Sequence, residues 1–202
     1  FYESRITNYE LRNPMTLTIT PLQNIPIIRQ DDNLADILVD SLQSSNVQLA
    51  NDDILVITQK IVSKAEGRMV NLAAITPNAR AIELAKKADK DPRVVELMLQ
   101  ESNEVLRVRK GTIIVEHKLG FVCANAGIDH SNVAPPLPEG EEPGRRADGS
   151  SRFAAHRVEA ARAEEYVLLL PEDPDQSARN IREQIQQKRG INIGVMIIDS
   201  HG

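Results

Sequence analysis

The pattern of apolar and polar positions along this chain predicts a mixture of helices and strands. Apolar residues at helical spacing follow helix-start signals at 31–42, 91–105 and 173–188, and Thr76-Pro77 is a fourth such signal. Short apolar runs typical of strands lie at 15–20, 54–57, 112–116, 121–124, 167–170 and 193–198. Strands and helices do not alternate strictly, so we expect an α+β fold, with mixed sheets and flanking helices, rather than a doubly wound sheet.

The two ends and one internal stretch depart from this pattern. Residues 1–14 are polar without a clear period, and we expect them to be an upstream segment outside a domain that opens at Met15. Prolines, glycines and charges predict an extended or disordered loop at 134–149, and the Ala-, Arg- and Glu-rich stretch 152–165 predicts an exposed helix. The chain stops directly after an apolar run, so we expect the domain, residues 15–202, to be truncated at its C-terminus.

Composition and charge narrow the class of protein. An apolar share of 41% and a charged share of 26% are ordinary for a globular chain, and no stretch reaches the roughly 20 apolar residues of a membrane helix. The net charge of -5 gives no reason to expect nucleic acid as a partner. The lone Cys123 excludes an internal disulfide, which suits a reducing cytoplasm, and its apolar surroundings favour a buried structural thiol over a nucleophile.

Three polar clusters, each at the end of an apolar run, are the candidate sites of chemistry. The first, 58–67, contains Lys60 and Lys64, which can meet anionic oxygens, and Gly67, which lets the backbone turn. A solvated charged loop is the alternative, and spacing alone favours it. The glycine-rich phosphate motifs of P-loop and Rossmann proteins do not occur in the chain, so neither of those folds is expected.

The second and third clusters each carry a carboxylate at a strand end. Asp129 lies in 125–132 among amide and hydroxyl groups, a setting that suits magnesium or manganese, although an Asx-type turn explains it equally well. Asp199 opens the third cluster, 199–202, and the two carboxylates could share a metal ion if their strands are neighbours. His130 and His201 are candidate acids or bases, but bystander histidines beside a polar site are commoner.

Taken together, four stretches of the chain resemble one family. They read T-Q-K-I-V-S-K-A-E-G, G-F-V-C-A-N-A-G-I-D-H-S-N, L-L-P-E-D-P-D-Q-S-A and I-I-D-S-H-G, and their order and approximate spacing also fit. They are similar to the coenzyme F420:L-glutamate ligases, and the similarity runs from about Met15 to Gly202. The long second motif is far more specific than any single short pattern.

The resemblance implies an enzyme that joins L-glutamate, and then further γ-linked glutamates, to the deazaflavin precursor of coenzyme F420. GTP would phosphorylate the acceptor carboxylate, and the glutamate amine would attack the resulting acyl phosphate. Two divalent ions, magnesium or manganese, would bind at each site, and a potassium ion is also implied. The family further implies a homodimer that uses GTP, L-glutamate and the deazaflavin precursor, with no nucleic-acid or membrane partner.

The resemblance also implies roles for individual positions. Asp129 and Asp199 match ligands of one metal ion, and Ser200 matches a ligand of a second. The nucleotide contacts would be made by Gln59, Lys60, Lys64, Asn132 and the wall Ile25-Pro26-Ile27-Ile28, which by itself would be an ordinary strand. Many family members carry a small hydroxyl residue where this chain has Gln59, so that contact is expected to differ in detail.

Two departures from the family pattern leave rival interpretations open. Family members usually pass within a few residues from S-N-V to L-L-P-E-D-P, whereas here a surface insertion at about 134–165 intervenes. The family also continues past the D-S-H-G position and draws further nucleotide and metal contacts from that part. The rivals to the ligase are therefore a non-catalytic nucleotide- or metal-binding homologue, or an inactive fragment, and an interaction domain that docks through the insertion.

Overall fold

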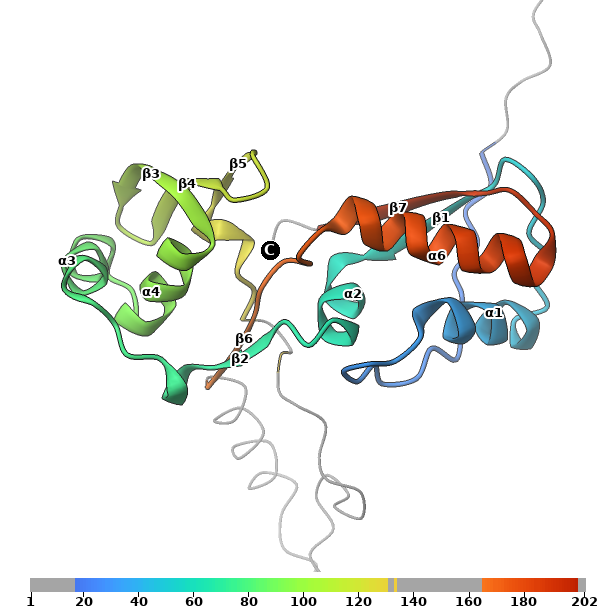
Figure 1. Cartoon of the computed structure of the whole chain (residues 1–202), viewed down its shortest axis with the longest axis horizontal. Coiled ribbons are helices and arrows are strands. Elements are labelled where there is room, and N and C mark those ends of the chain that lie inside the picture. The colour runs from blue at the N-terminus through green and yellow to red at the C-terminus, as the bar shows by residue number, and fades with distance from the viewer. Residues whose placement is uncertain (1–16, 131–132, 134–164, 200–202) are drawn as a thin grey trace, which may run out of the picture.

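The described residues, 17–130, 133 and 165–199 of a computed structural model, form two lobes joined by a short sheet (Figure 1). The lobe that we call the α1 lobe contains α1 (Leu34–Ser44), β1 (Ile54–Thr58), α2 (Gln59–Ala65), α6 (Pro174–Arg189) and β7 (Gly194–Ile198). The other, the α4 lobe, contains α3 (Ala79–Ala88), α4 (Pro92–Gln100), β3 (Ser102–Arg109), β4 (Thr112–His117), β5 (Val122–Ala124) and η2 (Asn125–Gly127). Between them lie β2 (Met69–Asn71), η1 (Leu72–Ala74) and β6 (Tyr166–Leu168). This is the expected α+β class, with neither a Rossmann nor a P-loop arrangement.

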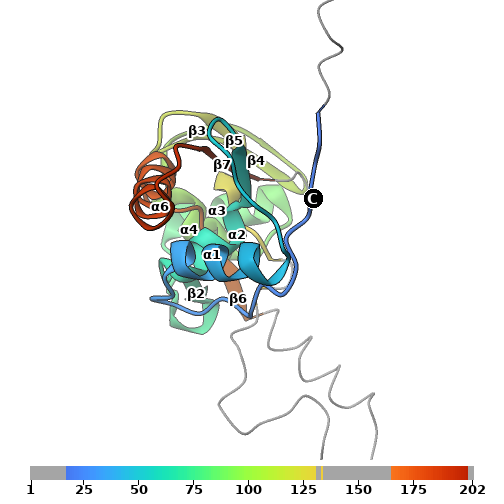
Figure 2. The same ribbon diagram turned by 90° about the vertical axis from the view of Figure 1, so that its right-hand side faces the viewer.

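The α1 lobe is built on the parallel pair β1 and β7, whose register runs from Ile54 beside Gly194 to Thr58 beside Ile198. One face buries Leu55 and Ile57 against α1 and α6, two helices that pack on each other (Figure 2). Burial of each such side chain contributes about 1.5–3 kcal/mol. The opposite face is also apolar but exposed, which explains the unbroken apolar runs in the sequence; it carries Ile54, Val56, Met196 and Ile198.

The α4 lobe has a separate core under an antiparallel meander. Its strands lie in the order β3, β4, β5, and α3 and α4 contribute the apolar side chains that face β4. Val95 and Met98 of α4 meet Ile113 and Val115 of β4, and all four are almost completely buried. The alternation along β4 places every second residue in this core, so the last of them, His117, is buried as well.

The two lobes are tied together through the antiparallel pair β2 and β6 and through Arg68, which precedes β2. The Arg68 guanidinium pairs with Glu101 at the end of α4, with Nη2 and Oε2 2.5 Å apart. Its Nε donates to the backbone oxygen of Leu170 at 2.9 Å. One side chain therefore binds both the α4 lobe and the segment that leads into α6.

Most expected elements are confirmed, and their ends carry the expected caps. Asn33 accepts hydrogen bonds from the first turn of α1, and Asp173 accepts one from the first turn of α6. Asp91 and Pro92 open α4 as predicted. Gly190 closes α6 in the left-handed conformation, at φ 69°, which a side chain disfavours.

Several expectations about elements were wrong. Residues 17–20 form no strand, since no described strand pairs with them, and Leu17 is 83% exposed. Residues 25–28 are likewise irregular. The third helix, α3, begins at Ala79, because Asn78 rather than Thr76 provides the cap. Residues 102–109 belong to β3, not to the preceding helix, and 59–65 form a helix, α2, rather than a solvated loop.

The expected loop at 134–149, the upstream segment 1–14 and all but the last residue of the exposed helix expected at 152–165 lie outside the described residues. Where the structure describes the chain, none of its helices has the length and apolar content needed to cross a membrane.

Candidate functional site

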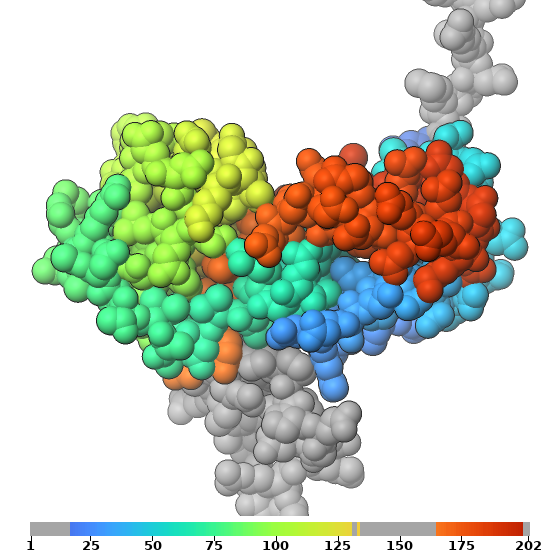
Figure 3. All heavy atoms as spheres, viewed as in Figure 1, coloured from blue at the N-terminus to red at the C-terminus, as the bar shows by residue number. Residues whose placement is uncertain are grey.

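The polar clusters predicted from the sequence gather where the strands of the α1 lobe end. Because β1 and β7 are parallel, their carboxyl ends lie at the same edge, and Thr58 pairs with Ile198 there. The residues that follow, Gln59 at the start of α2 and Asp199 after β7, are therefore neighbours in register. This edge faces the α4 lobe, and Figure 3 shows a notch between the lobes where the yellow end of the α4 lobe meets the orange start of α6.

Gln59 is buried, with 2% of its surface exposed, and its amide is held at one end only. Ser63 donates from Oγ to the Gln59 Oε1 at 2.8 Å, one helical turn away. The Gln59 Nε2 has no hydrogen-bond partner among the described residues. A buried donor without an acceptor costs about 1–3 kcal/mol, so a ligand that supplied an acceptor would gain by binding here.

Lys60 and Asp129 form the contact that joins two of the sequence motifs. The Lys60 Nζ lies 2.8 Å from the Asp129 Oδ2, and both side chains are partly buried, with 29% and 19% of their surface exposed. Asp129 is fixed in turn by Leu168 of β6, because each residue donates its backbone N–H to the carbonyl of the other at 2.9 Å. The backbone of Asp129 is thus fixed by β6, and its carboxylate lies beside α2.

Lys64 lies one turn after Lys60 on the same face of α2. Burial lowers the pKa of Lys64 below its ordinary 10.5, the charge of Lys60 lowers it further, and the carboxylate of Asp129 opposes both. Two ammonium groups and one carboxylate therefore share this region. An additional anion, such as a phosphate, would relieve the repulsion between the two lysines.

The turn that leads to Asp129 has an unusual backbone. Asn125, Ala126 and Gly127 all have positive φ, at 52°, 53° and 64°. Ala126 is also buried, so a non-glycine residue is held in a conformation that costs about 1–3 kcal/mol and clusters at functional sites. Gly127 packs so closely on Leu170 that a Cβ there would lie 2.6 Å from Cδ1. The shape of this turn therefore explains the motif A-N-A-G-I-D.

His130 follows Asp129, and its charged neighbours include Lys90 and Asp91 from the junction between α3 and α4. Burial lowers the pKa of His130 and nearby Lys90 lowers it further, whereas Asp129 and Asp91 raise it. These charged groups belong to the α4 lobe and to the turn that carries Asp129.

Asp199 lies near β5 of the α4 lobe. Burial raises the pKa of the Cys123 thiol, and the charge of Asp199 raises it further, so the thiol stays protonated. A structural thiol, as expected from the sequence, fits this environment better than a nucleophile does. Among the described residues no three His, Cys, Asp or Glu side chains come together as a metal site. Asn132, Ser200 and His201 lie outside the described part of the chain.

The segment 25–28 packs beside α2. Ile28 is buried in the same apolar cluster as Val62 of α2, and Ile25 and Ile61 border that cluster, whereas Ile27 is exposed. The backbone N–H of Asp31 donates to the carbonyl of Ala65 at 2.8 Å, which fixes the segment against the end of the helix. Residues 25–28, Gln59, Lys60 and Lys64 therefore all belong to the α1 lobe.

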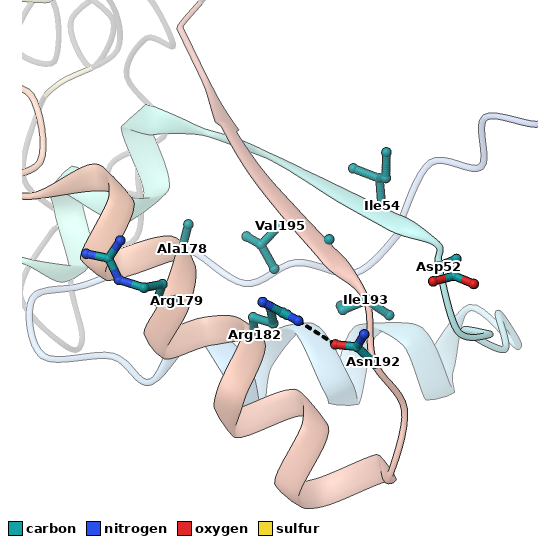
Figure 4. Close-up of a pocket in the computed structure, with 9 residues that line it drawn as sticks. Asp52, Ile54, Ala178, Arg179, Arg182, Asn192, Ile193 and Val195 are labelled. Atoms are coloured by element: carbon teal, nitrogen blue, oxygen red, sulfur yellow. Dashed lines mark hydrogen bonds between the residues drawn. The ribbon is translucent and has the colours of Figure 1, made fainter.

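A separate hollow of about 450 Å³ lies between α6 and the beginnings of β1 and β7, and it contains none of the predicted site residues (Figure 4). The Arg182 Nη2 there donates to the Asn192 Oδ1 at 2.7 Å. Because β1 and β7 begin here, the hollow lies at the opposite end of the strands from Gln59. Its lining is formed by Asp52, Ile54, Ala178, Arg179, Arg182, Asn192, Ile193, Gly194 and Val195.

Comparison with known proteins agrees with the motifs. A family model described as "F420-0:Gamma-glutamyl ligase" matches residues 23–141 and 154–202. A coenzyme F420:L-glutamate ligase from Methanopyrus kandleri is 37% identical over 187 residues, which cover 93% of this chain and 61% of the relative. Relatives of the same name from Methanothermobacter thermautotrophicus and Archaeoglobus fulgidus are each 34% identical over 188 residues, with 93% of this chain covered and 63% and 61% of the relatives. The chain spans about three fifths of the length of these proteins.

Proposed function

This chain belongs to the F420-0:gamma-glutamyl ligase family, and from that premise we propose that it carries the nucleotide- and metal-binding part of a GTP-dependent glutamate ligase. Its acceptor would be the deazaflavin precursor of coenzyme F420, to which it joins one L-glutamate and then further γ-linked residues. One observation carries the proposal. The Lys60–Asp129 ion pair brings a predicted nucleotide contact and a predicted metal ligand together from two distant motifs.

The proposed reaction has two steps. A carboxylate oxygen of the acceptor attacks the γ-phosphorus of GTP, the bond from that phosphorus to the β–γ bridging oxygen breaks, and GDP leaves. The neutral amine of L-glutamate then attacks the carbonyl carbon of the acyl phosphate, an amide bond forms, and inorganic phosphate leaves as the amine loses a proton. Both steps bring anions together, so the site must supply positive charge where the phosphates lie.

The residues of α2 can supply part of that charge. Lys60 would move its ammonium from Asp129 to a phosphate oxygen when nucleotide binds, and the half-buried ammonium of Lys64 would interact with the same phosphates. The free Nε2 of Gln59 would donate to an acceptor on the nucleotide, which would satisfy it. We assign the wall at 25–28 and Asn132 to the same nucleotide, as the family resemblance implies.

The carboxylates of Asp129 and Asp199 have the chemistry that a hard divalent cation requires. We propose that they, together with Ser200, hold magnesium or manganese ions, whose charge would offset that of the nucleotide phosphates. By the same resemblance we propose that the enzyme uses potassium, forms a homodimer and is cytoplasmic.

Product analysis tests this function directly. The protein is incubated with GTP, magnesium, L-glutamate and the unglutamylated precursor, and mass spectrometry follows glutamyl addition while GDP release is measured. We expect addition that requires GTP and is lost in Asp129→Asn. Tight GTP binding with no glutamyl addition would favour the non-catalytic binding module instead. This outcome matters because the chain covers about three fifths of the length of its relatives. The docking role of the insertion concerns residues 134–165, of which only Glu165 belongs to the described part of the chain.

A further inference from the structure

The parallel sheet of the α1 lobe has only two strands in the described part of the chain, so β1 and β7 each have one edge without a neighbouring strand. The N–H of Gly194 donates to the carbonyl of Asp53 at 2.8 Å, and it therefore points toward β1. Backbone groups alternate in direction along a strand, so those of Val195 and Ile197 point away from β1. No hydrogen bond joins them to another described residue. Such an edge is a template for an added strand.

The hollow of about 450 Å³ borders this edge of β7 (Figure 4). α6 packs against β7, and in the view of Figure 4 β7 lies between α6 and β1. Val195 lines the hollow from the strand, and Ala178 lines it from the helix. An extended backbone beside Val195 would therefore lie over α6, as β7 itself does.

Two arginines of α6 also line the hollow, and neither Arg179 nor Arg182 forms an ion pair with a described residue. Both are held by neutral acceptors: Arg182 donates to the Asn192 Oδ1 at 2.7 Å, and Arg179 donates to the Gln176 Oε1 at 3.1 Å. A guanidinium has five N–H donors, so most of them are left for a carboxylate. Asp52 is the one acidic residue in the lining, which therefore carries more positive than negative charge.

We propose that the free edge of β7 takes up an extended, acidic segment of the family's own polypeptide, which adds a strand to the sheet and places a carboxylate against Arg179 and Arg182. Backbone hydrogen bonds to Val195 and Ile197 supply affinity, and the arginines select an acidic side chain. About two fifths of the length of the Methanopyrus kandleri relative lies outside the matched residues, and we assign the segment to that part. A second copy of β7 fits less well, because the strand contains no acidic residue.

Peptide binding tests this inference without turnover, and so separates it from the proposed function. Overlapping synthetic peptides of about 12 residues, twice the usual length of a strand, cover the unmatched part of the Methanopyrus kandleri relative. Calorimetry measures their affinity for the chain, and NMR follows hydrogen exchange of the Val195 and Ile197 amides. We expect an acidic peptide to bind and to slow the exchange of both amides at least about tenfold.

Two pairs of variants test the two parts of the site. Val195→Pro removes the N–H at the β7 edge and should weaken peptide binding about tenfold. Val56→Pro is the matched control, because the N–H of Val56 points to the free edge of β1, and it should leave binding unchanged. The double charge reversal Arg179→Glu with Arg182→Glu should also weaken binding about tenfold, without a change in the strand. Arg189→Glu, on the same helix but outside the hollow, is its control.

Three results would overturn the inference. The first is that no acidic peptide of the set binds. The second is a bound peptide that leaves the Val195 and Ile197 amides unprotected, or that binds the double arginine variant as tightly as the parent. The third is a dimer of the parent in sedimentation that becomes a monomer in Val195→Pro, because a second copy of the chain would then occupy the edge.

Discussion

The ammonium of Lys60 and the carboxylate of Asp129 lie 2.8 Å apart, although α2 and the turn after β5 are far apart in the chain. The backbone of Asp129 makes two hydrogen bonds with that of Leu168, so it cannot move toward Lys60 without disturbing the sheet formed by β2 and β6. Lys60 is the more mobile partner, because its ammonium ends a flexible stem. The geometry therefore suits a lysine that exchanges one anion for another while the aspartate stays in place.

Asp129→Asn removes the charge of this pair and keeps its shape. We expect glutamyl addition to fall at least about 100-fold, because an amide cannot replace a carboxylate that organises charge at the reacting phosphate. Folding should change little, by about 1 kcal/mol or less, since both partners keep some contact with solvent. Product mass spectrometry and urea unfolding measure the two effects. Glu83→Gln, which breaks the exposed pair with Lys87, is the control and should alter neither.

Gln59→Met replaces the buried amide by an apolar side chain of similar size. The Gln59 Nε2 has no partner among the described residues, but methionine also removes the acceptor of the buried Ser63 hydroxyl, so the free energy of unfolding should fall by about 1–3 kcal/mol. GTP affinity should fall about fivefold to tenfold because one donor to the nucleotide is lost. Calorimetric titration with GTP and urea unfolding measure the two quantities. A large loss of stability with unchanged GTP affinity would show that Gln59 has a structural role only.

Much of the fold follows from local sequence, and the exceptions have physical causes. The caps at Asn33, Asp91 and Asp173 are short-range signals, and each begins its helix as predicted. β3 was not predicted because its sequence, S-N-E-V-L-R-V-R, is charged and suits a strand only when paired with β4. α2 was not predicted either, and its N-cap residue, Thr58, makes no side-chain capping hydrogen bond. The alternating pattern at 17–20 indicates strand propensity, but propensity without a paired neighbour does not make a strand.

The residues of the candidate site are predictions from sequence motifs, whereas the contacts between them come from the structure. The sequence motifs pointed to Lys60 and Asp129. Their contact depends on how the two lobes pack, and the spacing of residues along the chain does not determine that packing.

His117 should make the protein less stable in mild acid. It is buried, and its Nδ1 accepts the backbone N–H of Leu119 at 3.1 Å. Burial lowers the pKa of His117 below its ordinary 6.5 and Arg68 and Lys118 lower it further, against the opposing charge of Glu101. Between the lowered pKa and 6.5 the unfolded chain binds a proton that the folded chain does not. The free energy of unfolding is therefore highest above pH 6.5 and falls as the pH drops toward the lowered value.

Urea unfolding at several values between about pH 7.5 and 5.5 checks this effect in the parent and in His117→Gln. The glutamine can still accept from Leu119, so the variant should fold but lose stability less steeply as the pH falls. His130→Gln serves as the comparison, because burial lowers the pKa of His130 in the same direction. An equal pH dependence in the parent and in His117→Gln would assign the acid sensitivity to other groups.

Gly127→Ala tests whether the turn of left-handed residues positions Asp129. Gly127 has φ 64°, and an added Cβ would lie 2.6 Å from the Leu170 Cδ1, so both the backbone and the packing oppose the substitution. Gly111→Ala is a matched control, because its φ of 79° is equally unfavourable but no atom lies within 4 Å of the added Cβ. We expect Gly111→Ala to lower the free energy of unfolding by about 1 kcal/mol and Gly127→Ala to lower it by about 2–4 kcal/mol.

The packing part of the cost of Gly127→Ala comes from Leu170. Adding Leu170→Ala to Gly127→Ala should therefore lower the free energy of unfolding by less than the sum of the two separate effects. Glutamyl addition should fall in Gly127→Ala and stay unchanged in Gly111→Ala, since only the first alters the turn before Asp129; equal losses of activity in both would refute this role of the turn.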